Sequence, residues 1–228
     1  MSGSLWENLT RLSRMEAVGW FLRTWYGIPE LPPVPATPLI PSLLGQMLNL
    51  CRSYPTICGQ QNRLIPPVDL GAGLLCFYVE NQNVYRWAYR SGEADPVVLG
   101  QRLGTDAWVA EQERLSGFVL QVCVFEALFS APYTASAAWL PARALAEVLD
   151  RGQFQPILTP WRWPEDPTVF YASDGAIGVT SQQHRADGTS GFDVMVAAQD
   201  LAPLAYLPEL IRQHGDRWEH AQLASFVW

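Results

Sequence analysis

The clearest pattern of apolar and polar segments along the chain lies at residues 74–99. Residues 74–79 and 84–89 are apolar and aromatic runs, and the polar segment 80–83 connects them. Two β-prone runs around a short Asn-containing connection predict a β-hairpin. Because few charges interrupt either run, we expect both strands to lie inside a sheet rather than at its edge. A short third strand is expected at 97–99.

Helical spacing of apolar residues predicts the other elements of the first two thirds of the chain. A stripe from Leu5 to Trp25 predicts one amphipathic helix, which packs on its own domain more often than on a partner. Residues 27–41 contain six prolines and are expected to form either a linker or an extended strap across the surface. Further helices are predicted at 41–52, 105–130 and 140–150. Residues 56–73 are expected to form a connection.

The C-terminal third returns to a β pattern. Strands are predicted at 155–159, 169–173, 176–181 and 192–198, followed by helical residues at 201–213 that Pro208 interrupts. Consecutive hairpins with flanking helices predict an α+β fold, with a mainly antiparallel sheet of about five to six strands packed against several helices. We expect residues 1–40 to be a helix and a proline-rich strap, and residues 41–228 to be one α+β domain.

The central hairpin also carries a family resemblance. The order F-Y-x-E-N-Q-x-V-x-x-W, followed by D-P-V, resembles the SUKH superfamily, which includes fungal cell-wall regulators and many bacterial immunity proteins. The residues that carry it are Phe77, Glu80, Asn81, Gln82, Val84, Trp87, Asp95, Pro96 and Val97. The chain has one Pro before Val97 where two are common. The resemblance is clearest over residues 64–130 and extends from about residue 40 to the end. It implies an α+β domain that neutralises a toxin by direct contact.

The charge of the chain bears on the kind of partner. Acidic residues exceed basic ones by seven (22 minus 15), and every basic residue is Arg. Attraction to phosphate is a main source of affinity for nucleic acid, so an acidic chain is a poor general binder of it. Acidity suits a basic protein partner, such as a toxin domain, through steering and complementarity. The simpler alternative is that the charge only keeps the protein soluble.

Cysteine usage and apolar runs indicate the compartment. No secretory signal precedes the four cysteines, and no run approaches the ~20 apolar residues of a membrane helix. The cytoplasm with free thiols is therefore expected, without membrane association. Cys76 and Cys123 fall in apolar runs and are expected in the core.

Signals of catalysis are few. The sequence contains no Gly-rich phosphate loop, no G-x-S-x-G elbow and no H-E-x-x-H motif, and its histidine and cysteine spacings do not match a metal site. We therefore expect no catalytic, cofactor or metal residue. The carboxylate pairs Glu165–Asp166 and Glu111 with Glu113 are interpreted as solvated loop and helix faces. A Cys–His pair assembled in space stays possible, so an undetected hydrolase or transferase is the third alternative.

The candidate partner-binding residues fall in two places. Trp161 and Trp163 flank Arg162, and aromatic residues with Arg are typical of interface hot spots, although both rings could equally cover the end of a sheet. The other candidates are the hairpin residues Glu80, Asn81, Gln82, Trp87 and Asp95. Each has a structural alternative as a turn-capping, core or turn-initiating residue. The preferred hypothesis is an immunity protein, and the alternative is a regulatory or scaffold module of the same fold.

Overall fold

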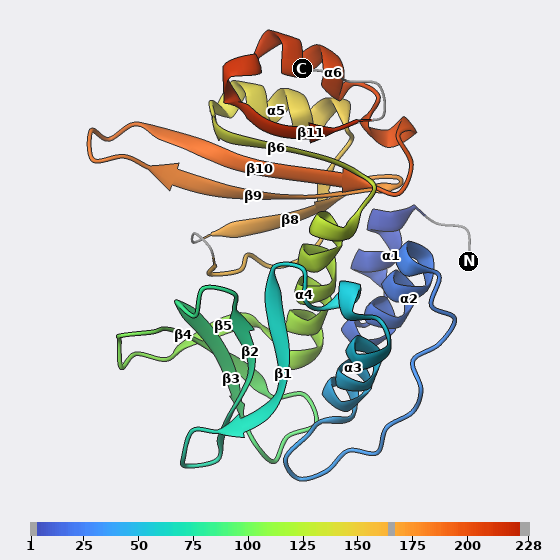
Figure 1. Ribbon diagram of the computed structural model, residues 1–228, viewed down its shortest axis with the longest axis vertical. Helices are drawn as coiled ribbons and strands as arrows, with labels where there is room; N and C mark the ends of the chain where they lie inside the picture. The colour runs from blue at the N-terminus through green and yellow to red at the C-terminus, as the bar shows by residue number, and fades with distance from the viewer. Residues whose placement is uncertain (1–3, 164–166, 224–228) are drawn as a thin grey trace. The chain divides into compact units, whose positions relative to one another are not determined.

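The computed structural model describes residues 4–163 and 167–223, apart from the side chain of Asp216. The chain forms two compact units: residues 12–126, called here the five-stranded unit, and residues 1–11 with 127–228, called the six-stranded unit (Figure 1). The boundary expected near residue 40 lies inside the five-stranded unit. The predicted α+β class and the antiparallel pairing are confirmed. The strands form two sheets of five and six strands rather than one.

The five-stranded unit contains a meander in the order β1-β2-β3-β4-β5. The predicted hairpin is confirmed, since β2 pairs with β3 and neither is an edge strand. Its elements are α2 (Arg14–Tyr26), α3 (Ser42–Ser53), η1 (Pro55–Ile57), β1 (Asn62–Asp69), β2 (Leu74–Glu80), β3 (Tyr85–Arg90), β4 (Val97–Arg102), β5 (Val109–Arg114) and the larger part of α4 (Leu115–Ser130).

The core of this unit forms where α4 meets the central strands. Phe118 of α4 makes ring contacts with Phe77, Tyr78 and Trp87, at centroid distances of 5.6, 5.9 and 5.7 Å. All four side chains are fully buried. Aromatic pairs at this spacing add about 0.5–1.5 kcal/mol each beyond the area they bury. The apolar hairpin and the apolar helix therefore stabilise each other.

The first helical stretch is two helices rather than the one predicted. α1 (Leu5–Arg11) ends before Ser13, and α2 starts after it. Ser13 forms a capping box, because its hydroxyl accepts from the N–H of Glu16 while the Glu16 carboxylate accepts from the N–H of Ser13. Such a box satisfies free donors at a helix start and so favours a new helix there. The apolar stripe continues through the break, which is why it predicted a single helix.

The helix predicted at 105–130 is also wrong over its first ten residues. Residues 109–114 form the strand β5, which pairs with β4. Glu111 is buried there and accepts a hydrogen bond from the indole N–H of Trp87 at 3.0 Å. Residues 62–69, expected to be part of a connection, form β1 in spite of Pro66 and Pro67. β1 is an edge strand, where a missing N–H donor is tolerated.

The proline-rich segment forms a strap within the five-stranded unit. Val34 packs so closely on α3 that a Cβ at Gly45 would come within 2.8 Å of its side chain. The Ser42 hydroxyl donates to the carbonyl of Val34 at 2.6 Å, and the Tyr89 hydroxyl donates to the carbonyl of Leu39 at 2.6 Å. The strap alternative is therefore the one that the structure shows.

The six-stranded unit has the strand order β11-β6-β10-β9-β8-β7. The predicted β8–β9 hairpin and the strand that follows it are confirmed. β6 and β11 were not predicted; β6 is rich in Ala and Ser, and pairing on both sides rather than local propensity holds it in the sheet. The elements are α1, β6 (Tyr133–Leu140), α5 (Ala142–Arg151), β7 (Gln155–Pro156), β8 (Thr168–Ala172), β9 (Ala176–His184), β10 (Ser190–Ala198), η2 (Ala202–Leu204), α6 (Leu207–Gln213), η3 (Gly215–Arg217) and β11 (Trp218–Gln222).

Candidate functional site

The hairpin turn contains one buried and two exposed candidate residues. Glu80 is 2% exposed, and its carboxylate accepts from the backbone N–H groups of Gln82 (2.9 Å) and Val84 (3.0 Å). Asn81 and Gln82 are exposed at the tip of the turn. Glu80 therefore closes the turn from inside, and of these three candidates only Asn81 and Gln82 present side chains to solvent.

The other two candidates of the hairpin region stabilise the fold. Trp87 has no exposed surface, and its indole N–H is bonded to Glu111. Asp95 accepts from both the backbone N–H (2.7 Å) and the hydroxyl (2.9 Å) of Ser116, in the first turn of α4. A carboxylate there satisfies a free helix donor and meets the positive end of the helix dipole. Both placements correspond to the structural alternatives for these residues.

Trp161 and Trp163 are interior residues of the six-stranded unit, with 0% and 8% of their surface exposed. Trp161 stacks on Phe170 of β8 at 5.8 Å, and its centroid lies 5.9 Å from that of Trp163. The rings therefore cover the sheet, which is the structural alternative for this pair.

The structure tests the interpretation of one of the two carboxylate pairs. The interpretation of Glu111 and Glu113 as a solvated helix face is wrong, because both lie in β5 and Glu111 is buried. Glu113 forms an ion pair with Arg14 at 2.8 Å. Glu165–Asp166 lies outside the described residues.

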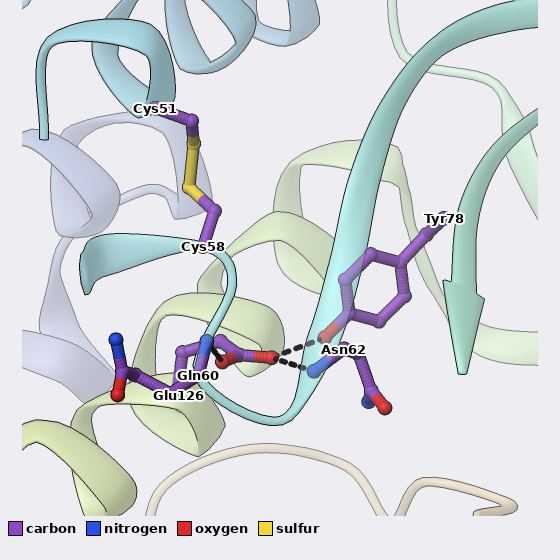
Figure 2. The surroundings of a disulfide bond; sticks show 6 residues. All are labelled: Cys51, Cys58, Gln60, Asn62, Tyr78 and Glu126. Atoms are coloured by element: carbon purple, nitrogen blue, oxygen red, sulfur yellow. Dashed lines mark hydrogen bonds between the residues drawn. A yellow bond between two sulfur atoms is a disulfide. The ribbon is translucent and has the colours of Figure 1, made fainter. Parts of the chain in front are cut away.

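A buried carboxylate on α4 accepts several hydrogen bonds within the five-stranded unit. Glu126 has no exposed surface and accepts four hydrogen bonds. Figure 2 draws the three from Gln60, Asn62 and Tyr78. Its Oε2 accepts from the N–H groups of Gln60 (2.7 Å) and Gln61 (2.8 Å). Its Oε1 accepts from the N–H of Asn62 and the hydroxyl of Tyr78, each at 2.9 Å. Burial raises the pKa of Glu126 above its ordinary value, although the four donors oppose the shift.

A disulfide joins the end of α3 to the segment that Glu126 holds. Cys51 and Cys58 are bonded, seven residues apart, and Figure 2 shows the bond beside residue 60. The expectation that all four thiols are free is therefore wrong for this pair. Cys76 and Cys123 are free and buried as predicted, and burial raises the pKa of the Cys123 thiol to about 12. Such a thiol is inert at neutral pH.

The six-stranded unit has an open pocket of about 410 Å³ beside the end of α5. Its lining combines an indole, two carboxylates, two amides and apolar surface. The residues are Trp6, Leu149, Asp150, Gln153, Phe154, Gln155 and Asp174. They come from α1, from α5 with the loop and strand after it, and from the β8–β9 turn. No sequence motif unites them, so reasoning from the sequence missed the pocket.

The charges in this pocket are uncompensated. Asp150 and Asp174 are exposed, and among the described residues neither carboxylate forms a hydrogen bond or ion pair. The neighbouring Arg151 does not neutralise them, because its guanidinium pairs with Glu209 at 2.7 Å. Trp6 is half-buried and contributes an aromatic surface. An indole and two unpaired carboxylates in one pocket attract a cation rather than an anion.

Comparison with family models, curated proteins and solved structures finds no match to the chain. Within residues 4–163 and 167–223, no three His, Cys, Asp or Glu side chains are grouped so as to hold a metal ion. None of the helices in those ranges has the length and hydropathy needed to span a membrane.

Proposed function

We propose that this chain is a non-enzymatic binding protein for a basic protein partner, in the role of an immunity protein that neutralises a toxin by direct contact. The pocket lined by Trp6, Asp150 and Asp174 is the observation that carries the proposal. The SUKH resemblance of the hairpin supports the immunity role, and the excess of acidic residues supports a basic partner.

The pocket fits one Arg or Lys side chain of the partner. The aliphatic stem would lie against Leu149 and Phe154, and the charged head would meet the Trp6 ring and the two carboxylates. A cation–π contact contributes about 0.5–2 kcal/mol, and a hydrogen bond to a charged group about 1.5–3 kcal/mol. A single anchored cation would thus account for a large share of a protein–protein affinity, as hot-spot residues do.

Affinity capture from the native cell with the wild-type chain, followed by mass spectrometry, tests the proposal. The test variant is Asp150→Asn/Asp174→Asn, and the matched control is Asp200→Asn, an exposed Asp of the same unit. We expect one dominant basic protein at equal stoichiometry with the wild type and the control. The double variant should bind it at least tenfold more weakly, since about 1.4 kcal/mol corresponds to a factor of ten. Equal capture by all three chains would refute the pocket as the site.

The regulatory or scaffold alternative predicts a different set of captured proteins in the same experiment. A set of cell-envelope or housekeeping proteins, instead of one toxin-like protein, would favour it. Deletion of residues 1–40 is unsuitable for separating the two hypotheses, because it removes Phe21 and Leu22 from one core and Leu9 from the other unit. The point variants keep both cores intact. A hydrolytic or transfer activity without a stoichiometric partner would instead favour the third alternative, an enzyme.

A further inference from the structure

One face of the five-stranded sheet carries an apolar row that crosses all five strands. Residues paired across antiparallel strands project to the same face. Cys76 pairs with Val68 on one side and with Ala88 on the other, Ala88 pairs with Leu99, and Leu99 pairs with Ala110. A row with no polar member on a sheet face requires a cover or a partner.

This face is the one opposite α4. Phe118 of α4 packs on Phe77, Tyr78 and Trp87, which form the core side of the sheet. On the other side, Leu74, Cys76 and Ala88 form a separate buried cluster. Its further members are Ile65, Val79, Leu99 and Trp108. All seven lie in strands or in the β4–β5 loop, so the apolar members of this cluster come from the sheet and its own loop.

Part of the apolar face remains in solvent. Val68 and Val97 are 52% and 40% exposed, and Ala110 is exposed at the β5 edge. Val97 lies two residues before Leu99 on β4 and therefore projects to the same side. The exposed apolar surface thus extends the buried cluster from β1 to β5.

Arginines flank the row on both sides. Arg63 and Arg86 are both paired with Val79, and Arg90 is paired with Leu74, which places all three on this face. Each guanidinium is hydrogen-bonded only to a neutral oxygen: Asn83 Oδ1 (3.2 Å), Gln101 Oε1 (2.8 Å) and the carbonyl of Ala72 (3.3 Å), respectively. Among the described residues no carboxylate pairs with any of the three. Arg114, by contrast, pairs with Glu93.

We propose that this face binds an acidic, amphipathic segment of a partner protein. Apolar side chains of the segment would cover the exposed apolar positions Val68, Val97 and Ala110 around the buried cluster. Its carboxylates would pair with Arg63, Arg86 and Arg90. Charge complementarity selects this occupant, because three uncompensated cations surround an apolar surface. The surface is separate from the pocket of the proposed function and attracts the opposite charge.

A protein segment fits this face better than nucleic acid. Stacking of bases needs free aromatic faces, and the only aromatic ring of the cluster, Trp108, already carries the Arg86 guanidinium 5.2 Å from its centroid. The apolar row is suited to packing against aliphatic side chains of a protein segment.

Fluorescence anisotropy with short labelled probes tests the proposal on the full chain. The probe is a peptide of alternating Glu and Leu, and the comparison probes are an alternating Lys and Leu peptide and a thymidine oligonucleotide of equal length. We expect saturable binding of the Glu/Leu peptide, weakening as salt is added, and none of the oligonucleotide. Any binding of the Lys/Leu peptide at the acidic pocket should be unchanged by variants on this face. No binding of that peptide, or binding of the oligonucleotide in its place, would overturn the proposal.

Variants at exposed positions tie the binding to this face. Arg63→Gln/Arg90→Gln should weaken binding of the Glu/Leu peptide at least fivefold. Arg102→Gln, which changes an exposed Arg of β4 on the other side of the sheet, should leave it unchanged. Val68→Glu should weaken binding and Val68→Lys should retain it, since both replace the same exposed side chain with opposite charges. The assignment of the peptide to this face would be refuted if Val68→Glu and Val68→Lys changed its affinity equally. It would also be refuted if Arg102→Gln weakened binding as much as Arg63→Gln/Arg90→Gln.

Discussion

Replacing Glu126 by Gln tests whether the buried carboxylate stabilises the five-stranded unit. Each carboxylate oxygen accepts two hydrogen bonds, from the N–H groups of residues 60–62 and the hydroxyl of Tyr78. A Gln side chain keeps one oxygen, but its NH₂ group cannot accept. Two buried donors therefore lose their acceptor in Glu126→Gln.

The magnitude follows from those two bonds. A hydrogen bond to a charged group contributes about 1.5–3 kcal/mol, so two lost bonds cost about 3–6 kcal/mol. Removing a buried charge recovers part of this, because desolvation of the carboxylate no longer opposes folding. We expect the free energy of unfolding to fall by about 3 kcal/mol. Glu93→Gln, which alters an ion pair whose side chains are 53% and 63% exposed, should cost less than about 1 kcal/mol.

Urea denaturation monitored by tryptophan fluorescence measures the loss of stability. Native-state hydrogen exchange at the amides of residues 60–62 gives a second, local measurement, because these amides donate to Glu126 directly. In Glu126→Gln they should exchange much faster than in the wild type, and in Glu93→Gln at the wild-type rate. A loss below about 1 kcal/mol with the three amides still protected would refute the stabilising role.

Three further predictions concern the same unit. Cys51→Ala/Cys58→Ala should lower the free energy of unfolding by about 2.5 kcal/mol, the loop entropy of a short closed loop; an unchanged urea midpoint under reducing and oxidising conditions would contradict this. Asp95→Ala should cost about 1 kcal/mol by removing the cap on Ser116 at the start of α4, and Asp95→Asn should cost less because one oxygen remains. The pH dependence of stability should reflect Glu126. Because its pKa in the folded state lies above its ordinary value of 4.5, the folded protein binds more protons than the unfolded chain above that pH, and the free energy of unfolding should fall as pH rises from 4.5. Urea titrations across this range should show a flatter profile for Glu126→Gln, and an identical slope would exclude this residue as the cause.

Errors in the predicted elements arose where a second signal, local in one place and tertiary in the other, competed with the helical periodicity. The apolar stripe through residues 5–25 is continuous, but the Ser13 capping box divides it into two helices. Residues 109–114 resemble the start of the helix that follows them, yet pairing with β4 makes them a strand. In both places the competing signal was weaker in the sequence than the helical periodicity.

The candidate interface residues show the same limit. Glu80, Trp87 and Asp95 belong to the segment that carries the family resemblance, and their side chains are bonded within the chain. Trp161 and Trp163 are buried. Exposure depends on which segments pack together, and the residue type alone does not reveal it.

The sequence alone determined the α+β class, the two hairpins and the burial of the free thiols. These follow from alternation and apolar runs, which are local properties of the chain. Only the tertiary structure decided the Cys51–Cys58 pairing and the four-donor site of Glu126. It alone also assembled the pocket that joins Trp6 to Asp150 and Asp174. Each of these unites side chains from separate segments, and no local pattern records which segments a fold will bring together.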